Sequence, residues 1–145
     1  MNNYIKMEKR HQKDFENFPK FFAFGNEQFN KGMEKLELDP KDEDKIFTLY
    51  GAGDYYRKAD KEKLLAMLED HNKEFKEAIQ ADKTGEGFIF KMFSYELKNH
   101  EYNYTESVLD TLDALNLTLE EINNNPNLKH GLDLAKKAQS EQAFK

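Results

Sequence analysis

The spacing of hydrophobic positions in the N-terminal part changes from helical to strand-like and back to helical. Residues 5–18 carry apolar side chains among charged ones at helical spacing, a pattern that Pro19 ends because a residue before proline avoids helical geometry. Residues 21–24, FFAF, indicate a short buried strand. Residues 27–37 indicate an amphipathic helix with Asn26 as its N-cap.

The segment KIFTLYGAGDYYRK, residues 45–58, carries the clearest strand signal. β-Branched and aromatic residues lie on both sides of Gly51-Ala52-Gly53, which predicts a β-hairpin with its turn at the glycines. With residues 21–24 it would form a three-stranded sheet, and the third strand matters because an isolated hairpin is marginally stable in water. We expect Phe21, Phe22, Phe24 and Phe29 to lie in the hydrophobic core, with at least three of these side chains facing the same interior.

The rest of the chain has helical periodicity. Asp60 precedes a long helix that should end before the loop KTGEG at 83–87, and another helix follows from Gly87. We expect further helices from Thr105, from the N-cap Thr118 with Glu121 completing a capping box, and from Pro126 after Asn125, which places proline in the first turn.

These elements predict an α+β fold with a small N-terminal antiparallel sheet packed on a mainly helical C-terminal half. A chain of 145 residues suits one domain, here 1–145. Within it we distinguish an N-terminal helix or arm at 1–19, a strand–helix–hairpin part at 20–58 and a helical part at 59–145.

The charge of the chain narrows the classes of partner. Its formal net charge is -6, and charged residues make up 34% against a usual share of roughly 25%. The sequence shows no basic stripe, and only Arg10 and Arg57 among 22 cationic residues are arginine, the preferred reader of phosphate and guanine. We therefore expect no direct non-specific binding of nucleic acid.

Cysteine and hydropathy bear on the compartment. The chain has no cysteine, which excludes disulfides and thiolate metal sites and favours a reducing, cytoplasmic setting. The longest apolar runs are a few residues, so neither a membrane span nor a signal peptide is expected.

Sequence motifs give little support to catalysis or metal binding. The four histidines lie far apart and form no metal-ligand spacing, so we predict no metal and no cofactor. The segment from His100 and Glu101 to Tyr102 and Tyr104 is the most suggestive of acid–base chemistry. The simpler interpretation is an interhelical loop held by tyrosine packing and side-chain hydrogen bonds. We predict that the protein is not an enzyme.

Two neighbouring features suggest a surface for a partner. Asp42, Glu43 and Asp44 form an acidic run that lacks the ligand spacing of a calcium loop, and a solvated loop is its plainest interpretation. The alternative is a negative patch that docks on a basic cleft.

The hairpin supplies possible anchors beside it. Of Tyr55 and Tyr56, one should face outward beside Asp54 and Arg57, residue types that suit an interface. A cross-strand pair with Phe47 or Leu49 is the equal alternative.

Four blocks of the sequence resemble a family of small acidic proteins encoded by bacteriophages and other mobile elements, a family without an assigned activity. The blocks are FFAFGNEQFNKGMEKL, IFTLYGAGDYYRK, ELKNHEYNYT and TLDALNLTLEEINNNPNLKHGLDLA, which span about residues 20–137. Such proteins are similar in profile to inhibitors of host defence, including anti-CRISPR proteins, many of which act on the basic channel of an RNA-guided nuclease. The resemblance carries no site residues with it.

The resulting expectation is a non-enzymatic inhibitor that binds a bacterial RNA-guided nuclease or another defence protein in the host cytoplasm. It would interfere with the handling of guide or target RNA. Two alternatives stay open: a small hydrolase or nucleic-acid-processing enzyme that uses His100 and Glu101, and an accessory regulator that binds a host factor. Exposed phenylalanine is also compatible with a homodimer.

Overall fold

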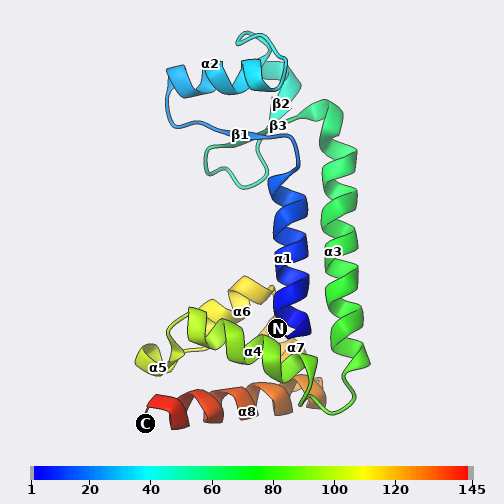
Figure 1. The fold of residues 1–145 in the computed structure, drawn as a ribbon, viewed down its shortest axis with the longest axis vertical. Coiled ribbons are helices and arrows are strands. Elements are labelled where there is room, and N and C mark those ends of the chain that lie inside the picture. Colours follow the sequence, from blue (N-terminus) through cyan, green and yellow to red (C-terminus); the bar gives the residue numbers. More distant parts are fainter. Residues whose placement is uncertain (1, 144–145) are drawn as a thin grey trace. The chain divides into compact units, whose positions relative to one another are not determined.

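The computed structural model describes residues 2–143, and these form two compact units (Figure 1). One unit comprises residues up to His11 together with those from Lys73 onward, and the other comprises Gln12–Asn72. Helices α1 (Asn3–Glu16) and α3 (Lys61–Ala81) each contribute residues to both units. The single domain expected for 1–145 stays a prediction.

The unit Gln12–Asn72 contains a small sheet and a helix that packs on it. Its elements besides α1 and α3 are β1 (Phe21–Phe22), α2 (Asn26–Lys35), β2 (Ile46–Phe47), β3 (Asp54–Arg57) and the single 3-10 turns Glu43–Lys45 and Lys58–Asp60. The strand order is β1-β3-β2 and both pairings are antiparallel. The predicted hairpin and the predicted third strand are thus confirmed.

Side-chain alternation divides the phenylalanines of residues 21–24 between the core and solvent. Phe21 and Ala23 are buried against α2, whereas Phe22 and Phe24 are 54% and 79% exposed. Phe29 is half-buried in the same cluster, so the expectation that at least three of the four phenylalanines face one interior is wrong. Neighbouring residues of a strand point to opposite faces, and α2 covers one face only.

Two predicted helix starts are also wrong, the first by one residue and the second by four. Helix α2 has Gly25 rather than Asn26 as its N-cap. Thr105 is the last residue of the short helix α5 (Tyr102–Thr105), and the next helix, α6 (Leu109–Leu115), begins after its N-cap Val108. Short polar side chains favour several positions near a helix end, which makes such boundaries hard to fix from sequence.

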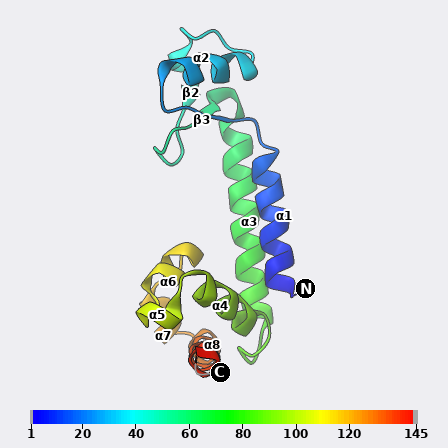
Figure 2. The same cartoon turned by 60° about the vertical axis from the view of Figure 1, so that its left-hand side comes forward.

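The other unit is helical, and its centre is the pair formed by α4 (Phe88–Asn99) and α8 (Pro126–Ala143) (Figures 1 and 2). Its elements beyond α1 and α3 are α4 (Phe88–Asn99), α5, α6 (Leu109–Leu115), α7 (Leu119–Asn123) and α8 (Pro126–Ala143). A Cβ on Gly131 would lie 2.5 Å from the Ile89 side chain, and Gln139 Nε2 donates to the Ser94 carbonyl at 3.3 Å. The two helices therefore run in the same direction and touch through a glycine.

Predicted helix starts in this unit are confirmed by their hydrogen bonds. The Thr118 hydroxyl accepts from the Glu121 N–H at 3.1 Å and caps α7. The side-chain oxygen of Asn125 accepts hydrogen bonds from the N–H groups of Asn127 and Leu128 in the first turn of α8. Both residues satisfy backbone donors that a helix start leaves without partners.

The loop between α3 and α4 is organised by the carboxylate of Asp82. It accepts hydrogen bonds from the backbone N–H groups of Gly85, Gly87 and Ile89 at 2.9 to 3.1 Å. Burial by itself raises the pKa of Asp82, but these bonds favour the charged form more strongly, so the pKa lies below its usual value. A loop in this unit is thus fixed by one acidic side chain.

The structure confirms the α+β class, with a small antiparallel sheet in the N-terminal half and helices predominating after it. Across residues 2–143, no helix combines the length and the apolar character needed to cross a bilayer.

Candidate functional site

Asp54, expected at a partner surface, instead holds the hairpin loop together from inside. Its side chain is buried, with 1% of the residue exposed. Oδ1 accepts from the Thr48 hydroxyl at 2.9 Å and the Ala52 N–H at 3.0 Å, and Oδ2 accepts from the N–H groups of Leu49 at 3.0 Å and Tyr50 at 2.9 Å. Burial acts to raise the pKa of Asp54, but these hydrogen bonds outweigh it and hold the pKa well below the usual value.

The two tyrosines that follow Asp54 pack inside the unit. Tyr56 is fully buried and lies opposite Phe47 across the strands, with ring centroids 5.5 Å apart. Burial and then the Asp54 charge raise the pKa of Tyr56 to about 12. Tyr55 is half-buried and stacks on Phe21 at 5.1 Å. Tyr56 therefore forms the cross-strand pair with Phe47 that the sequence analysis gave as the alternative to an exposed interface residue.

The remaining residues of the predicted patch differ in their exposure. Arg57 is half-buried and donates from Nε to Asp60 at 2.7 Å. Asp42 is half-buried, whereas Glu43 and Asp44 are exposed. The seven residues predicted from sequence thus share no common surface, because Asp54 and Tyr56 lie in the interior.

The segment after α4 also divides between core and solvent. Tyr102 is buried in the helical core, while Tyr104 is 87% exposed. Glu101 is exposed and adopts a left-handed backbone conformation with φ of 56°. No contact brings the side chains of His100 and Glu101 together within the described residues, so the pair proposed for acid–base chemistry is not assembled.

His100 instead faces a buried carboxylate that the sequence analysis missed. Its Nε2 lies 3.3 Å from Oε2 of Glu96, one helical turn earlier. The other oxygen of Glu96 accepts a hydrogen bond from the Tyr4 hydroxyl at 2.7 Å. Burial and the hydrogen bond to Glu96 raise the pKa of Tyr4 above its usual range. The spacing of Glu96 and His100 could have revealed their contact, but nothing in the sequence points to Tyr4.

This Tyr4–Glu96–His100 network links α1 to α4. The Thr111 hydroxyl adds a link from α6 by donating to the Glu96 carbonyl at 3.3 Å. Both oxygens of the carboxyl group are engaged by groups of the protein itself, so the hydrogen-bonding needs of this buried side chain are met internally. Its geometry is that of a structural link within the helical unit.

The most distinctive surface feature is a segment without positive charge. Residues 99–128 carry carboxylates but neither lysine nor arginine, and we call residues 101–121 of this stretch the acidic segment. All its carboxylate residues are exposed: Glu101, Glu106, Asp110, Asp113, Glu120 and Glu121. None of them forms an ion pair with another described residue. The segment contains α5, α6 and the start of α7, three helices that pack on the α4–α8 pair.

Large apolar side chains are exposed within the same segment. Tyr104, Leu109 and Leu119 all lie at the surface, one on each of its three short helices. Exposed apolar groups surrounded by charged ones are the composition of a protein interface, in which a few anchors lie inside a polar rim.

The structure offers little for metal binding. Within residues 2–143 there is no group of three or more histidine or carboxylate side chains arranged to hold a metal ion.

Comparison with known proteins gives a family and no activity. Residues 3–138 match the model described as "Family of unknown function (DUF7659)". Neither a curated protein nor a solved structure matches the chain. Because the match extends over nearly the whole sequence, the chain belongs to the family of unknown function DUF7659.

Proposed function

We propose that the protein is a non-enzymatic binding protein whose acidic segment docks on a basic surface of a partner protein. The observation that carries this proposal is the set of six exposed carboxylates with no lysine or arginine among them. Complementary charge would speed association and select the partner, while Tyr104, Leu109 and Leu119 would supply contact area.

The partner that we propose is a bacterial RNA-guided nuclease or another basic defence protein. The reasons are the negative charge of the segment and the sequence resemblance to small acidic proteins of mobile elements. The guide and target channel of such nucleases is positively charged and would accept a carboxylate-rich surface. Action on such a partner would take place in the cytoplasm of the bacterial host.

The enzymatic alternative has one point of support, the contact between His100 and Glu96. A general base needs a carboxylate or imidazole that a substrate can reach. Glu96 is buried and Tyr4 occupies its second oxygen, so a structural role explains the network better. The accessory regulator differs from the main proposal only in the identity of its partner.

The test measures association of the purified protein with a panel of guide-loaded RNA-guided nucleases at low and high salt. We expect binding that weakens steeply with salt and inhibition of target cleavage. In the double variant Asp113→Lys, Glu120→Lys, affinity should fall by at least about tenfold.

The matched control carries the same change of net charge elsewhere. Glu69→Lys with Asp70→Lys alters two exposed carboxylates of α3 and should change affinity by less than about threefold. Equal losses in both double variants would refute docking through the acidic segment. An absence of binding to every nuclease of the panel would refute the proposed partner.

A further inference from the structure

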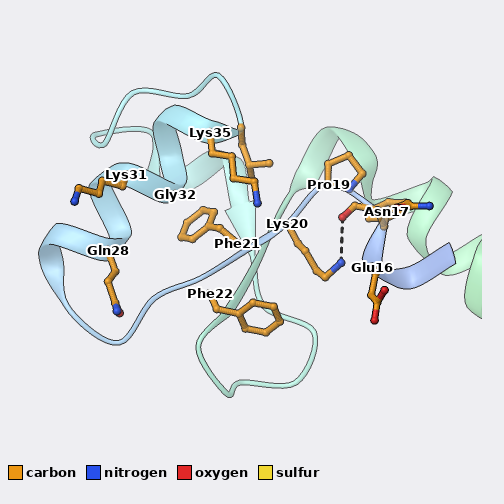
Figure 3. A pocket seen from close by; sticks show the side chains of 12 residues that line it. Glu16, Asn17, Pro19, Lys20, Phe21, Phe22, Gln28, Lys31, Gly32 and Lys35 are labelled. Atoms are coloured by element: carbon orange, nitrogen blue, oxygen red, sulfur yellow. Dashed lines mark hydrogen bonds between the residues drawn. The ribbon is translucent and has the colours of Figure 1, made fainter. Parts of the chain in front are cut away.

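The unit Gln12–Asn72 contains a hollow of about 590 Å³ between β1, α2 and the residues that join α1 to β1 (Figure 3). Ligand sites commonly measure roughly 300 to 1,000 Å³. Phe21, Gly32 and Leu36 contribute to its lining. A Cβ on Gly32 would lie 2.1 Å from the Phe21 ring, so α2 rests directly on β1 at this point.

The rim of the hollow is positively charged in a chain whose net charge is -6. Lys20, Lys31 and Lys35 line it, against the single carboxylate of Glu16. Lys31 also pairs with Glu27 at 3.3 Å, but both side chains are largely exposed and such a pair exchanges readily with solvent. The hollow therefore offers an excess of positive charge.

Lys20 is held in place at one end of the hollow. Its ammonium group donates to the carbonyls of Phe15 and Phe18 and lies 4.5 Å from the centre of the Phe15 ring. Burial and the neighbouring charge of Lys35 lower its pKa below the usual value. A carboxylate placed between these two lysines would relieve their repulsion.

One edge of the sheet borders the hollow. The strand order β1-β3-β2 makes β1 an edge strand. Phe21 pairs with Tyr55, and the Ala23 N–H donates to the Gly53 carbonyl on β3 at 2.9 Å. Backbone groups alternate in direction along a strand, so the N–H and C=O of Phe22 point away from β3.

The same edge ends at a defined position. The N–H of Phe24 donates to the side-chain oxygen of Gln28 at 2.8 Å. This donor is therefore occupied, and the strand edge open to a partner ends at Phe22. The Phe22 side chain itself is exposed. An incoming strand would thus find backbone hydrogen-bonding groups, an apolar contact and cations in one place.

We propose that this hollow binds an extended segment of a partner protein that carries carboxylate side chains and adds to β1 as a further strand. The inference is independent of the acidic segment, which belongs to the other unit. Strand addition supplies main-chain hydrogen bonds, and pockets or charges beside the strand supply specificity. A peptide fits better than a nucleic acid, because a nucleic acid would not use the strand edge and no arginine lines the hollow.

The test uses a fluorescein-labelled seven-residue peptide of alternating glutamate and valine, with fluorescence anisotropy as the readout. Alternation places all glutamates on one side of an extended chain. We expect the full-length protein to bind this peptide, and the double variant Lys31→Glu, Lys35→Glu to bind it at least about tenfold more weakly. Lys63→Glu with Lys76→Glu, two exposed lysines of α3, is the control with the same charge change and should retain binding.

Two further measurements distinguish strand addition from simple charge attraction. N-methylation of either the glutamate or the valine nitrogens removes the donors of one peptide edge, and one of these two peptides should lose binding. The Phe22 amide should gain protection from hydrogen exchange when the unmodified peptide is bound.

Four outcomes would overturn the proposal. The first is an absence of peptide binding at millimolar concentration, and the second is equal binding of a peptide with lysine in place of glutamate. Tighter binding of a ten-nucleotide oligo(dT) would identify a phosphate backbone as the ligand. A dimer of the protein alone that the Lys31→Glu, Lys35→Glu variant abolishes would identify a second copy as the occupant.

Discussion

Replacing Asp54 by asparagine is expected to destabilise the hairpin although it changes the size of the side chain very little. Each carboxylate oxygen of Asp54 accepts two hydrogen bonds, from Thr48 and Ala52 on one side and from Leu49 and Tyr50 on the other. An amide has one accepting oxygen and one NH₂ group. In either orientation of the amide, two donors of the loop would therefore face another donor.

The cost follows from these two lost interactions. A hydrogen bond to a charged acceptor contributes about 1.5–3 kcal/mol, so two of them amount to about 3–6 kcal/mol. The two bonds that remain also weaken, because a neutral oxygen replaces a charged one. Total stabilities of proteins are about 5–15 kcal/mol, so Asp54→Asn should remove a large share of the free energy of unfolding.

The assay is urea unfolding followed by far-UV circular dichroism, with amide hydrogen exchange of Leu49, Tyr50 and Ala52 as the local readout. All three amides should exchange faster in the variant. Asp44→Asn is the matched control, since it removes the same charge from an exposed site and should change the free energy of unfolding by less than about 0.5 kcal/mol.

The difference between wild type and Asp54→Asn should also depend on pH. The folded-state pKa of Asp54 lies well below the ordinary value of 3.8, so its contribution to stability is fully present above that pH and is lost as the pH falls through the folded-state pKa. The two unfolding free energies should begin to converge below about pH 4 and should meet only below the folded-state pKa. A difference smaller than about 1 kcal/mol at pH 7, or unchanged exchange at the three amides, would refute the role assigned to Asp54.

Two further changes test the packing of each unit. Gly32→Ala should lower the free energy of unfolding by about 1–3 kcal/mol, because a Cβ would lie 2.1 Å from the Phe21 ring. A variant that is more stable than wild type in thermal unfolding would contradict this contact. Tyr4→Phe should cost about 2 kcal/mol in urea unfolding, because it removes the hydroxyl that donates to buried Glu96. The same change at exposed Tyr104 should have almost no effect, and equal effects at both positions would show that the buried hydrogen bond contributes nothing.

The sequence predicted most elements because their signals are local. The glycines at 51 and 53 and the aromatic residues around them indicated the hairpin, and Thr118 and Asn125 indicated helix starts that their hydrogen bonds confirm. The wrong predictions concern which side chains are buried. Phe22 looked like core because it lies in an apolar run, but only one face of β1 is covered.

The roles of Asp54 and Glu96 depended still more on the folded structure. Asp54 looked like a surface charge, because the four donors that surround it become neighbours only when the loop closes over it. Glu96 was overlooked because its main partner, Tyr4, is 92 positions away in the sequence. The spacing of Glu96 and His100 indicates only their mutual contact, and neither the Tyr4 bond nor the four donors around Asp54 share a regular element with their acceptor.

The sequence by itself determined the α+β class, the net charge, the absence of cysteine and the long stretch without lysine or arginine, since these follow from composition and local periodicity. Only the tertiary structure decided which charges are buried and which remain at the surface. It also created the lysine-lined hollow, because β1 and α2 are brought together there by packing of Phe21 on Gly32. Local patterns determine elements, whereas burial and cavities are properties of chain segments that meet in space.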